Sequence, residues 1–254
     1  MQAPVVIGRG LCMYIPMQLD LIPATFLCRY QRFLADVRLG DGTTITVHCP
    51  NSGSMRSLLT PEVSCWLRDA GAETKRKLRY TLVLLALPRP RGRRQHPHWA
   101  LVDTGLPNRL AEEAIRRGRI PELAGYAQLR REVAYGQLNA RGKPGSRIDL
   151  LLRDPARPPC YIEIKNDTML SESAPARADF PDAVTARGRK HLHELSAVAA
   201  SGARAVMLYL VNRSDCRAAG IAEDIDPTYA TALVQARAAG VETYAWQSAL
   251  RWRG

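Results

Sequence analysis

Two carboxylates and an amine stand at a spacing that could support phosphodiester chemistry. In segment 161–165, the two-residue period of a β-strand places Glu163 and Lys165 on one face and two isoleucines on the other. A preceding apolar segment, 147–152, contains one acid, Asp149. If these strands pair, Asp149 and Glu163 can converge on one Mg²⁺ or Mn²⁺ ion, which prefers oxygen ligands. Lys165 could then orient an attacking water or stabilise charge on the phosphate.

A third acid could complete this cluster. Glu132, in the strand predicted before Asp149, is the favoured candidate, and Glu113, on a preceding helix, is the other. The alternative is structural, since a glutamate beside a lysine in a strand is commonly an exposed cross-strand pair.

A polar stripe on the helix predicted at 185–200 could face phosphates beside this cluster. Arg187, Lys190, His191 and Glu194 recur at helical spacing, whereas the leucines form a separate stripe. His191 could also shuttle a proton. The alternatives are an ordinary solvated helix face and a structural histidine.

Other cations stand beside aromatic residues in the first third of the chain, a pattern that suits backbone tracking with base stacking. The cations predicted to contact DNA outside the helix are Arg29, Arg32, Lys75, Arg76, Lys77 and Arg147. An amphipathic strand with outward arginines would give the same pattern. The polar segment 48–55 could cradle a phosphate through its backbone N–H groups, or could be a plain turn.

The elements that must position these residues fall into two groups. The first is β-rich: a strand is expected at 24–37, a hairpin signal stands at Asp41-Gly42, a β-branched segment follows at 43–49, and apolar, partly alternating segments lie at 62–67 and 77–87. Short strands joined by tight turns predict a small barrel. A Pro/Arg-rich loop at 88–98 precedes a further strand at 99–103, and we place the domain boundary between residues 88 and 89.

The remainder, 89–254, alternates helices and strands, which predicts a mixed α/β sheet domain. Helices are expected at 107–117, at 185–200 and from Asp226-Pro227 to Gly240. Strands are expected at 132–136, 147–152, 161–165, 205–211 and 241–246, and the uninterrupted apolar run at 205–211 is typical of a buried central strand.

The composition bounds the class of protein. The chain has 254 residues, 46% of them apolar, and a formal net charge of +12. The excess of positive charge indicates a polyanionic partner, most often nucleic acid, although an arginine-rich composition typical of a GC-rich genome is an alternative. No apolar run is long enough to span a membrane, and residues 1–33 lack a signal-peptide pattern. The six cysteines have no metal-site spacing, which favours free thiols in the cytoplasm over a hidden disulfide or zinc site.

Together these segments resemble the sugar fermentation stimulation protein A family of bacteria and archaea. The match runs from about residue 22 to residue 246, in order. The segments that carry it are RYQRFLADV (29–37), HCPNSGSM (48–55), KRK (75–77), PNRL (107–110), EVAYG (132–136), SRIDLLL (146–152), YIEIKN (161–166), FPDAVTARGRKHL (180–192) and IDPTYA (225–230).

The resemblance implies an N-terminal OB-like β-barrel, a C-terminal domain similar to PD-(D/E)XK nucleases, and DNA binding with little sequence preference. Asp149, Glu163 and Lys165 match the D…E-x-K core of that nuclease pattern. The sequence departs from the family in its leader, residues 1–21, in the arginine-rich insertion at 89–94, and in K-N-D-T-M-L after the lysine. There Asp167 adds a negative charge, which could supply another ligand or weaken the approach of a phosphate.

Three functions follow from these expectations. The chain could be a Mg²⁺-dependent nuclease or, alternatively, a non-catalytic DNA-binding regulator linked to sugar (maltose) utilisation. A regulator acting only through protein contacts is the third, and no sequence feature supports it. Single- and double-stranded DNA are both expected partners, a membrane is not, and the oligomeric state is left open, with a dimer as one option.

Overall fold

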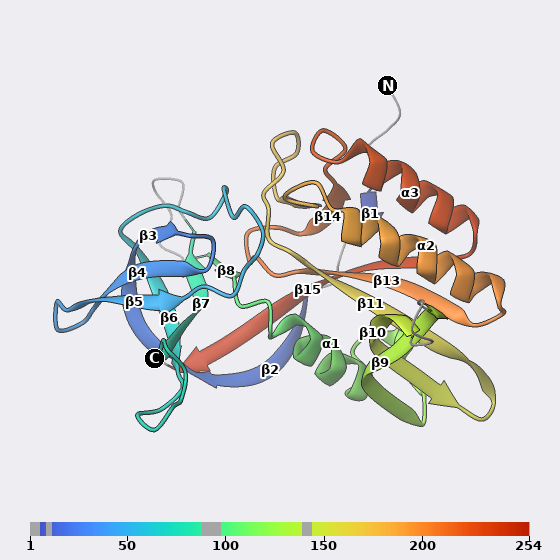
Figure 1. Cartoon of the computed structure of the whole chain (residues 1–254), viewed down its shortest axis with the longest axis horizontal. Helices are drawn as coiled ribbons and strands as arrows, with labels where there is room; N and C mark the ends of the chain where they lie inside the picture. The colour runs from blue at the N-terminus through green and yellow to red at the C-terminus, as the bar shows by residue number, and fades with distance from the viewer. Residues whose placement is uncertain (1–5, 9–11, 88–97, 139–143, 254) are drawn as a thin grey trace.

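The computed structural model describes residues 6–8, 12–87, 98–138 and 144–253. Two halves lie side by side, a β-barrel formed early in the chain and a larger sheet covered by helices (Figure 1). Within the described residues, no helix is both long and apolar enough to cross a membrane. The predicted fold class, an OB barrel followed by a mixed-sheet α/β domain, is confirmed.

Five strands close the barrel. They are β3 (Ile22–Tyr30), β4 (Leu34–Leu39), β5 (Thr44–His48), β6 (Val63–Asp69) and β7 (Tyr80–Ala86), in the order β5-β4-β3-β6-β7, and the pairing of β5 with β7 completes the closure. The predicted Asp41-Gly42 hairpin joins β4 to β5, with Gly42 at φ +88°. The single strand expected at 24–37 is wrong, because Gln31 and Arg32 adopt left-handed φ angles that turn the chain between β3 and β4.

The barrel is filled by the inward residues of its strands. Fully buried members include Phe26, Val37, Val47, Leu67 and Leu82. These residues alternate with more exposed neighbours in β4 and β5, as expected for strands with one face in a core. The expected small barrel therefore follows from local patterning.

The second half is built on a six-stranded sheet of order β2-β15-β13-β11-β10-β9. These strands are β2 (Cys12–Asp20), β9 (Gln128–Leu138), β10 (Pro144–Asp154), β11 (Arg157–Asp167), β13 (Arg204–Val211) and β15 (Glu242–Arg253). β11, β13, β15 and β2 run parallel, and β10 and β9 are antiparallel to their neighbours. β13 is central and buried on both faces, as its apolar run predicted.

Three helices cover this sheet. α1 (Pro107–Arg116) packs on the face that carries Ile162 and Ile164, and α2 (Ala186–Ala200) and α3 (Pro227–Ala238) lie side by side on the other face (Figure 1). All three were predicted within a few residues. The side chain of Asp226, from the predicted Asp226-Pro227 start, caps α3 by accepting the N–H of Tyr229, and the Thr185 side chain caps α2 by accepting that of Gly188.

Three short strands form a further small sheet in the order β1-β14-β12. They are β1 (Val6–Gly8), β12 (Arg177–Phe180) and β14 (Ala218–Ile221), and a 3₁₀ turn, η1 (Pro121–Leu123), follows α1. None of these was predicted, because strands of three or four residues carry too short a pattern to be recognised.

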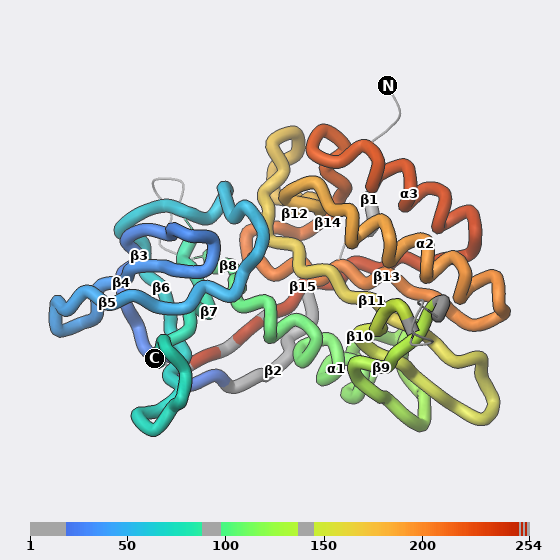
Figure 2. Tube along the Cα trace, in the orientation of Figure 1, coloured from blue at the N-terminus to red at the C-terminus, as the bar shows by residue number. Residues whose placement is uncertain are grey.

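The sheets do not divide where the sequence suggested, between residues 88 and 89. β8 (Trp99–Leu101) pairs with β7 of the barrel sheet, and β2, from the leader, pairs with β15 of the larger sheet. β15 runs from the larger half toward the barrel (Figure 2), where Trp252 packs edge-on against Trp66 and Trp99. The two halves are therefore joined by strands and by a shared tryptophan cluster. The arginine-rich insertion at 89–94 lies outside the described residues.

Candidate metal and nucleic-acid site

The two predicted carboxylates and the predicted amine come together where β10 and β11 diverge. Their antiparallel register pairs Leu150 with Ile162, so Asp149 and Glu163 leave the two strands at the same level. Lys165 follows Glu163 on the same face, and its Nζ donates to Glu163 Oε1 over 2.7 Å. The alternative of an exposed cross-strand pair does not hold, because the Glu163 side chain is only 4% exposed and that of Lys165 12%.

Asp149 is held in place from two elements. Asn108 Nδ2, on the first turn of α1, donates to Oδ1 over 2.8 Å, and the backbone N–H of Ile164 donates to Oδ2 over 2.7 Å. Burial and the charge of Glu163 raise the pKa of Asp149 to about 6. Two carboxylates that face each other without a cation are thus electrostatically unfavourable.

Only one of the two carboxylate oxygens of Glu163 is free to bind a cation. Lys165 and His191 both contact its Oε1, whereas Oε2 is buried and has no hydrogen-bond partner among the described residues. Burial alone would raise the pKa of Glu163, but the hydrogen bond from His191 and the charge of Lys165 outweigh it and lower the pKa. An ionised glutamate with one free, buried oxygen is what a bound cation requires.

His191 belongs to this cluster rather than to an exposed stripe of α2. It is 6% exposed, its Nδ1 contacts Glu163, and its Nε2 lies 3.4 Å from Arg187 Nε. Because the arginine can only donate, Nε2 accepts and Nδ1 carries the proton given to Glu163. His191 therefore orients the glutamate, and Arg187 lies behind it at the other ring nitrogen.

Neither candidate for a third acid reaches the cluster. Glu132 lies on β9 at the level of Asp149, but it has φ +53° and an exposed side chain, with no hydrogen bond to the site. Glu113 pairs with Arg117 on the outer side of α1. No group of three or more His, Cys, Asp or Glu able to hold one ion occurs in the parts of the chain that the structure describes. Two carboxylates remain, which is enough for Mg²⁺ because that ion retains several waters.

Asn108 is the functional residue that sequence reasoning missed. It lies within the P-N-R-L segment at the start of α1, directly after the proline that begins the helix. That segment marked the helix, but nothing in it indicated that α1 packs against β10 and β11. From α1, the amide of Asn108 rather than the carboxylate of Glu113 thus contacts the cluster.

The barrel arginines are engaged with a loop of the barrel itself. Arg29 donates to the carbonyls of Asn51, Gly53 and Ser54 over 2.7–3.1 Å, and Arg32 Nε donates to that of Ser52 over 3.0 Å. The loop predicted as a phosphate cradle therefore directs several carbonyls at these arginines. Both side chains hold the loop, and with its bond to Arg32 O the Arg29 guanidinium uses four of its five N–H groups in contacts within the barrel.

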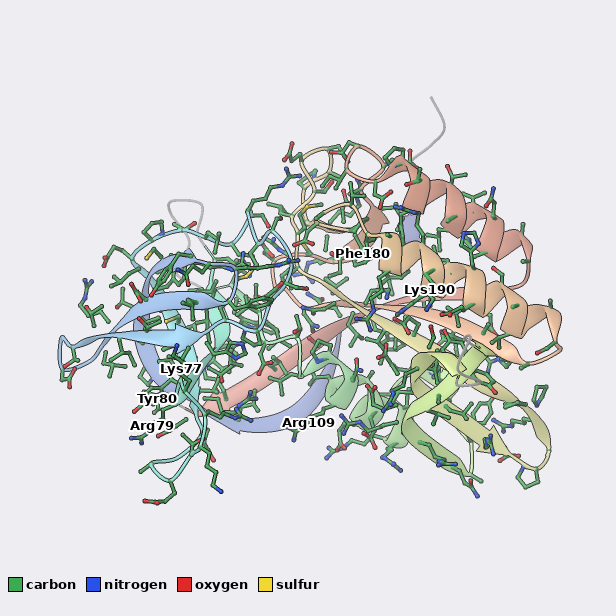
Figure 3. The ribbon with its side chains drawn as sticks, in the orientation of Figure 1. Lys77, Arg79, Tyr80, Arg109, Phe180 and Lys190 are labelled. Carbon is green, nitrogen blue, oxygen red and sulfur yellow. The ribbon has the colours of Figure 1, made fainter. Side chains whose placement is uncertain are left out.

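The remaining cations are exposed on both halves of the molecule. Lys75, Arg76 and Lys77 lie on the loop between β6 and β7, outside the strand predicted to begin at residue 77. Arg147 is exposed on β10, and Lys190 Nζ donates to Gly145 O and Ser146 Oγ. Figure 3 shows Lys77 on the barrel and Lys190 on α2, on separate halves. Of the predicted DNA-binding residues, all of them described, the structure brings only His191 into contact with one of the two carboxylates of the site, and Arg187 contacts that histidine.

Because Asp149 titrates near neutrality, metal binding should depend on pH. The pKa of Asp149 is higher in the folded, metal-free protein than in the unfolded chain, so its protonated form stabilises the fold at low pH. That contribution to folding stability is lost as the pH rises through about 6. Mn²⁺ affinity, measured by calorimetry, should rise about tenfold per pH unit below 6 and level off above 7. An Asp149→Asn variant should lose this dependence, and a flat profile in the parent protein would contradict the assignment.

The sequence is similar to known proteins along most of its length. Residues 105–253 match the family model described as the sugar fermentation stimulation protein RE domain, and residues 27–93 match the SfsA N-terminal OB domain. The chain is 48% identical over 230 residues to a sugar fermentation stimulation protein homolog of Agrobacterium fabrum, covering 91% of this chain and 89% of that protein. It is 47% identical over 232 residues to a homolog of Rhodospirillum rubrum, with 88% of each chain covered.

A solved structure shares the fold. SfsA of Pyrococcus furiosus, determined in complex with Ca²⁺, superimposes with a TM-score of 0.74 at 24% sequence identity, over 91% of this chain and 90% of that chain. The two family models, the long alignments to relatives and the common fold agree, and the chain belongs to the sugar fermentation stimulation protein (SfsA) family.

Proposed function

We propose that this protein binds DNA with little sequence preference and holds a divalent metal ion, Mg²⁺ or Mn²⁺, between Asp149 and Glu163, where it hydrolyses phosphodiester bonds. The observation that carries the proposal is the buried, partner-free Oε2 of Glu163 beside a second carboxylate and a lysine. The Ca²⁺ complex of the Pyrococcus furiosus relative supports a divalent ion in this fold.

Each residue of the cluster has a distinct task in this proposal. Asp149 and Glu163 Oε2 would hold the metal, which when bound would polarise a phosphate oxygen and lower the pKa of a coordinated water. Lys165 places a cation beside the carboxylates, where it can stabilise negative charge that develops on the phosphate. His191 orients Glu163 through Nδ1, and Asn108 does the same for Asp149.

The exposed cations would hold the strand that supplies the phosphate. They stand on the β6–β7 loop, on β10 and on α2, so contacts would extend over both halves of the molecule. Such contacts are directed to the sugar–phosphate backbone and carry no sequence information, which accounts for the low specificity proposed.

Removal of either carboxylate should weaken metal binding strongly. Asp149→Ala and Glu163→Ala should each weaken Mn²⁺ binding at least about tenfold in calorimetry, because only two acidic ligands are present. Glu223→Ala, which removes an exposed acid that makes no hydrogen bond or ion pair with the cluster among the described residues, is the matched control. Unchanged binding in both site variants would remove the proposed metal centre.

Salt should weaken the complex with DNA in proportion to the phosphates contacted. For about five contacts, a plot of log K against log salt concentration should have a slope of roughly −4 to −5 with double-stranded DNA, and a shallower one with single strands. Fluorescence anisotropy at several salt concentrations measures it. A salt-insensitive complex would count against DNA binding, and binding without metal-dependent cleavage would support the non-catalytic regulator instead.

A further inference from the structure

A pocket of about 530 Å³ lies on the outside of the barrel, at the seam where β5 pairs with β7. Thr81 of β7 is the register partner of His48 on β5 and of Arg68 on β6, so these three lining residues form one row across three strands. The row points outward, because the next residue along each strand belongs to the barrel core, namely Val47, Leu67 and Leu82. The wall of the pocket is therefore built on paired strands, which hold its groups in place.

The loop between β6 and β7 adds two cations to this wall. Arg76 and Lys77 line the pocket, both are exposed, and neither side chain makes a hydrogen bond or ion pair with a residue that the structure describes. Arg79, at the end of the same loop, is instead held by Asp69 and lies outside the pocket lining. Two cations of this loop are therefore free to bind an anion in the pocket.

Asp103 is the acid among the described lining residues, and it is already paired. It is 2% exposed, its Oδ1 accepts the N–H of Gly105 over 2.9 Å, and its Oδ2 lies 2.8 Å from Arg68 Nη2. Three cations against one carboxylate leave this lining with a formal surplus of two positive charges, with His48 counted as neutral. The pocket therefore matches an anion of two charges, for which Arg68 keeps further N–H groups.

We propose that this pocket binds a phosphate monoester, whose phosphate lies between Arg68 on the wall and Arg76 and Lys77 on the loop. A monoester carries a charge of about −1.5 to −2 at pH 7 and three acceptor oxygens, whereas a diester within a strand carries about one charge. The exposed His48 ring supplies a further N–H donor. The volume falls within the roughly 300–1,000 Å³ typical of small-molecule sites, so a sugar attached to the phosphate also fits.

Two sources can present such a group, a free sugar phosphate and the phosphorylated end of a nucleic-acid strand. Arg76 and Lys77 are also among the proposed DNA contacts, so the second source rests on the proposed function and the first does not. None of the described lining residues contacts Asp149 or Glu163, so binding of the monoester requires neither a metal ion nor cleavage.

Calorimetry of the full-length protein with ribose 5-phosphate, without DNA or metal, tests the pocket. Ribose 5-phosphate should bind at millimolar concentration or below, and its methyl diester, which has the same sugar but one charge fewer, should bind about tenfold more weakly. No binding of ribose 5-phosphate at about 10 mM, or equal affinity for the monoester and the diester, would overturn the proposal.

The loop cations supply the variants. Arg76→Ala and Lys77→Ala should each weaken ribose 5-phosphate binding about tenfold, because each removes a charged donor from the phosphate. Both side chains are exposed on a loop, so the barrel core is untouched. Arg79→Ala removes the same charge outside the pocket, and its affinity should stay within about twofold of that of the parent protein. An equal loss in all three variants would show an effect of general charge only and would overturn the pocket.

Fluorescence anisotropy with single-stranded oligonucleotides in EDTA distinguishes the two sources. If the pocket takes strand ends, a phosphate at the 5′ or 3′ end should strengthen binding about fivefold over the same strand with hydroxyl ends, and this ratio should fall to about one in Arg76→Ala. A ratio of about one in the parent protein, together with normal binding of ribose 5-phosphate, assigns the pocket to a free sugar phosphate. A preference for phosphorylated ends that persists in both loop variants would overturn the assignment of strand ends to this pocket.

Mn²⁺ titration separates this result from the proposed metal centre. Mn²⁺ binding at Asp149 and Glu163 should be unchanged in the Arg76→Ala and Lys77→Ala proteins. A parent protein that binds Mn²⁺ but not ribose 5-phosphate would refute the phosphate pocket and leave the metal centre in place. Binding of ribose 5-phosphate without binding of Mn²⁺ would do the reverse.

Discussion

Lys165→Ala should lower metal-dependent cleavage of DNA by about 10²- to 10³-fold, the loss measured when one group that stabilises developing charge is removed from an enzyme. The Lys165 ammonium is largely buried and contacts Glu163 over 2.7 Å, so no solvent cation replaces it efficiently. Single-turnover cleavage with saturating Mn²⁺ measures the chemical step directly.

A control variant distinguishes a role of Lys165 in cleavage from the general loss of one positive charge. Arg237→Ala removes the same charge from an exposed position on α3, and its cleavage rate should stay near that of the parent protein. Mn²⁺ binding by the Lys165→Ala protein should persist, because both carboxylates remain. If the rate falls equally in both variants, or does not fall at Lys165, the lysine has no part in the chemistry.

Asp226→Ala should have the largest effect on stability, a loss of about 3 kcal/mol in the free energy of unfolding. The Asp226 side chain is buried and accepts the N–H groups of Tyr229 and Thr185, so it connects the starts of α3 and α2. It also accepts from Thr228 Oγ1 and pairs with Arg189. Removing it leaves buried donors unsatisfied at two helix ends.

The pH dependence of this loss has a definite sign. Burial would raise the pKa of Asp226, but the hydrogen bonds, with that from the Thr185 N–H the largest, outweigh it and lower the pKa. A depressed pKa stabilises the folded protein above the unfolded value, about 3.9, and this contribution is lost as pH falls through the folded pKa. The difference between the parent and variant proteins should therefore shrink below about pH 4.

Urea unfolding at several pH values measures this difference. Asp224→Ala, an exposed acid two residues away, should change stability by no more than about 0.5 kcal/mol. An Asp226→Ala protein as stable as the control at pH 7 would show that the contacts of Asp226 do not hold α2 and α3.

Residues that depend on local periodicity could be predicted from the sequence. The strand period placed Glu163 with Lys165 and separated them from Ile162 and Ile164, as the structure shows. The Asp226-Pro227 pair marked the start of α3, and the helix predicted from residue 185 is α2, which begins at Ala186. Such signals depend on side chains only a few positions apart. The folded structure preserves them because a buried core requires the same alternation of apolar and polar residues.

Residues that depend on packing between distant segments could not be predicted. Nothing near Asn108 indicates that it reaches Asp149, which lies 41 residues further along the chain. The same holds for His191, whose helical stripe fits solvent as well as the glutamate that it contacts. Glu132 was favoured because its strand adjoins that of Asp149, but the positive φ of its backbone leaves its side chain exposed.

By itself, the sequence determined the succession of strands and helices, the family, and the presence of an acid–amine pair on one strand, because each depends on side chains a few positions apart. Only the tertiary structure decided which carboxylates meet, which arginines are committed to the barrel's own loop, and that the carboxylate of Asp167 is buried. Those outcomes depend on strand register and on how the two halves pack. Both are set by the burial of many residues at once rather than by any short segment.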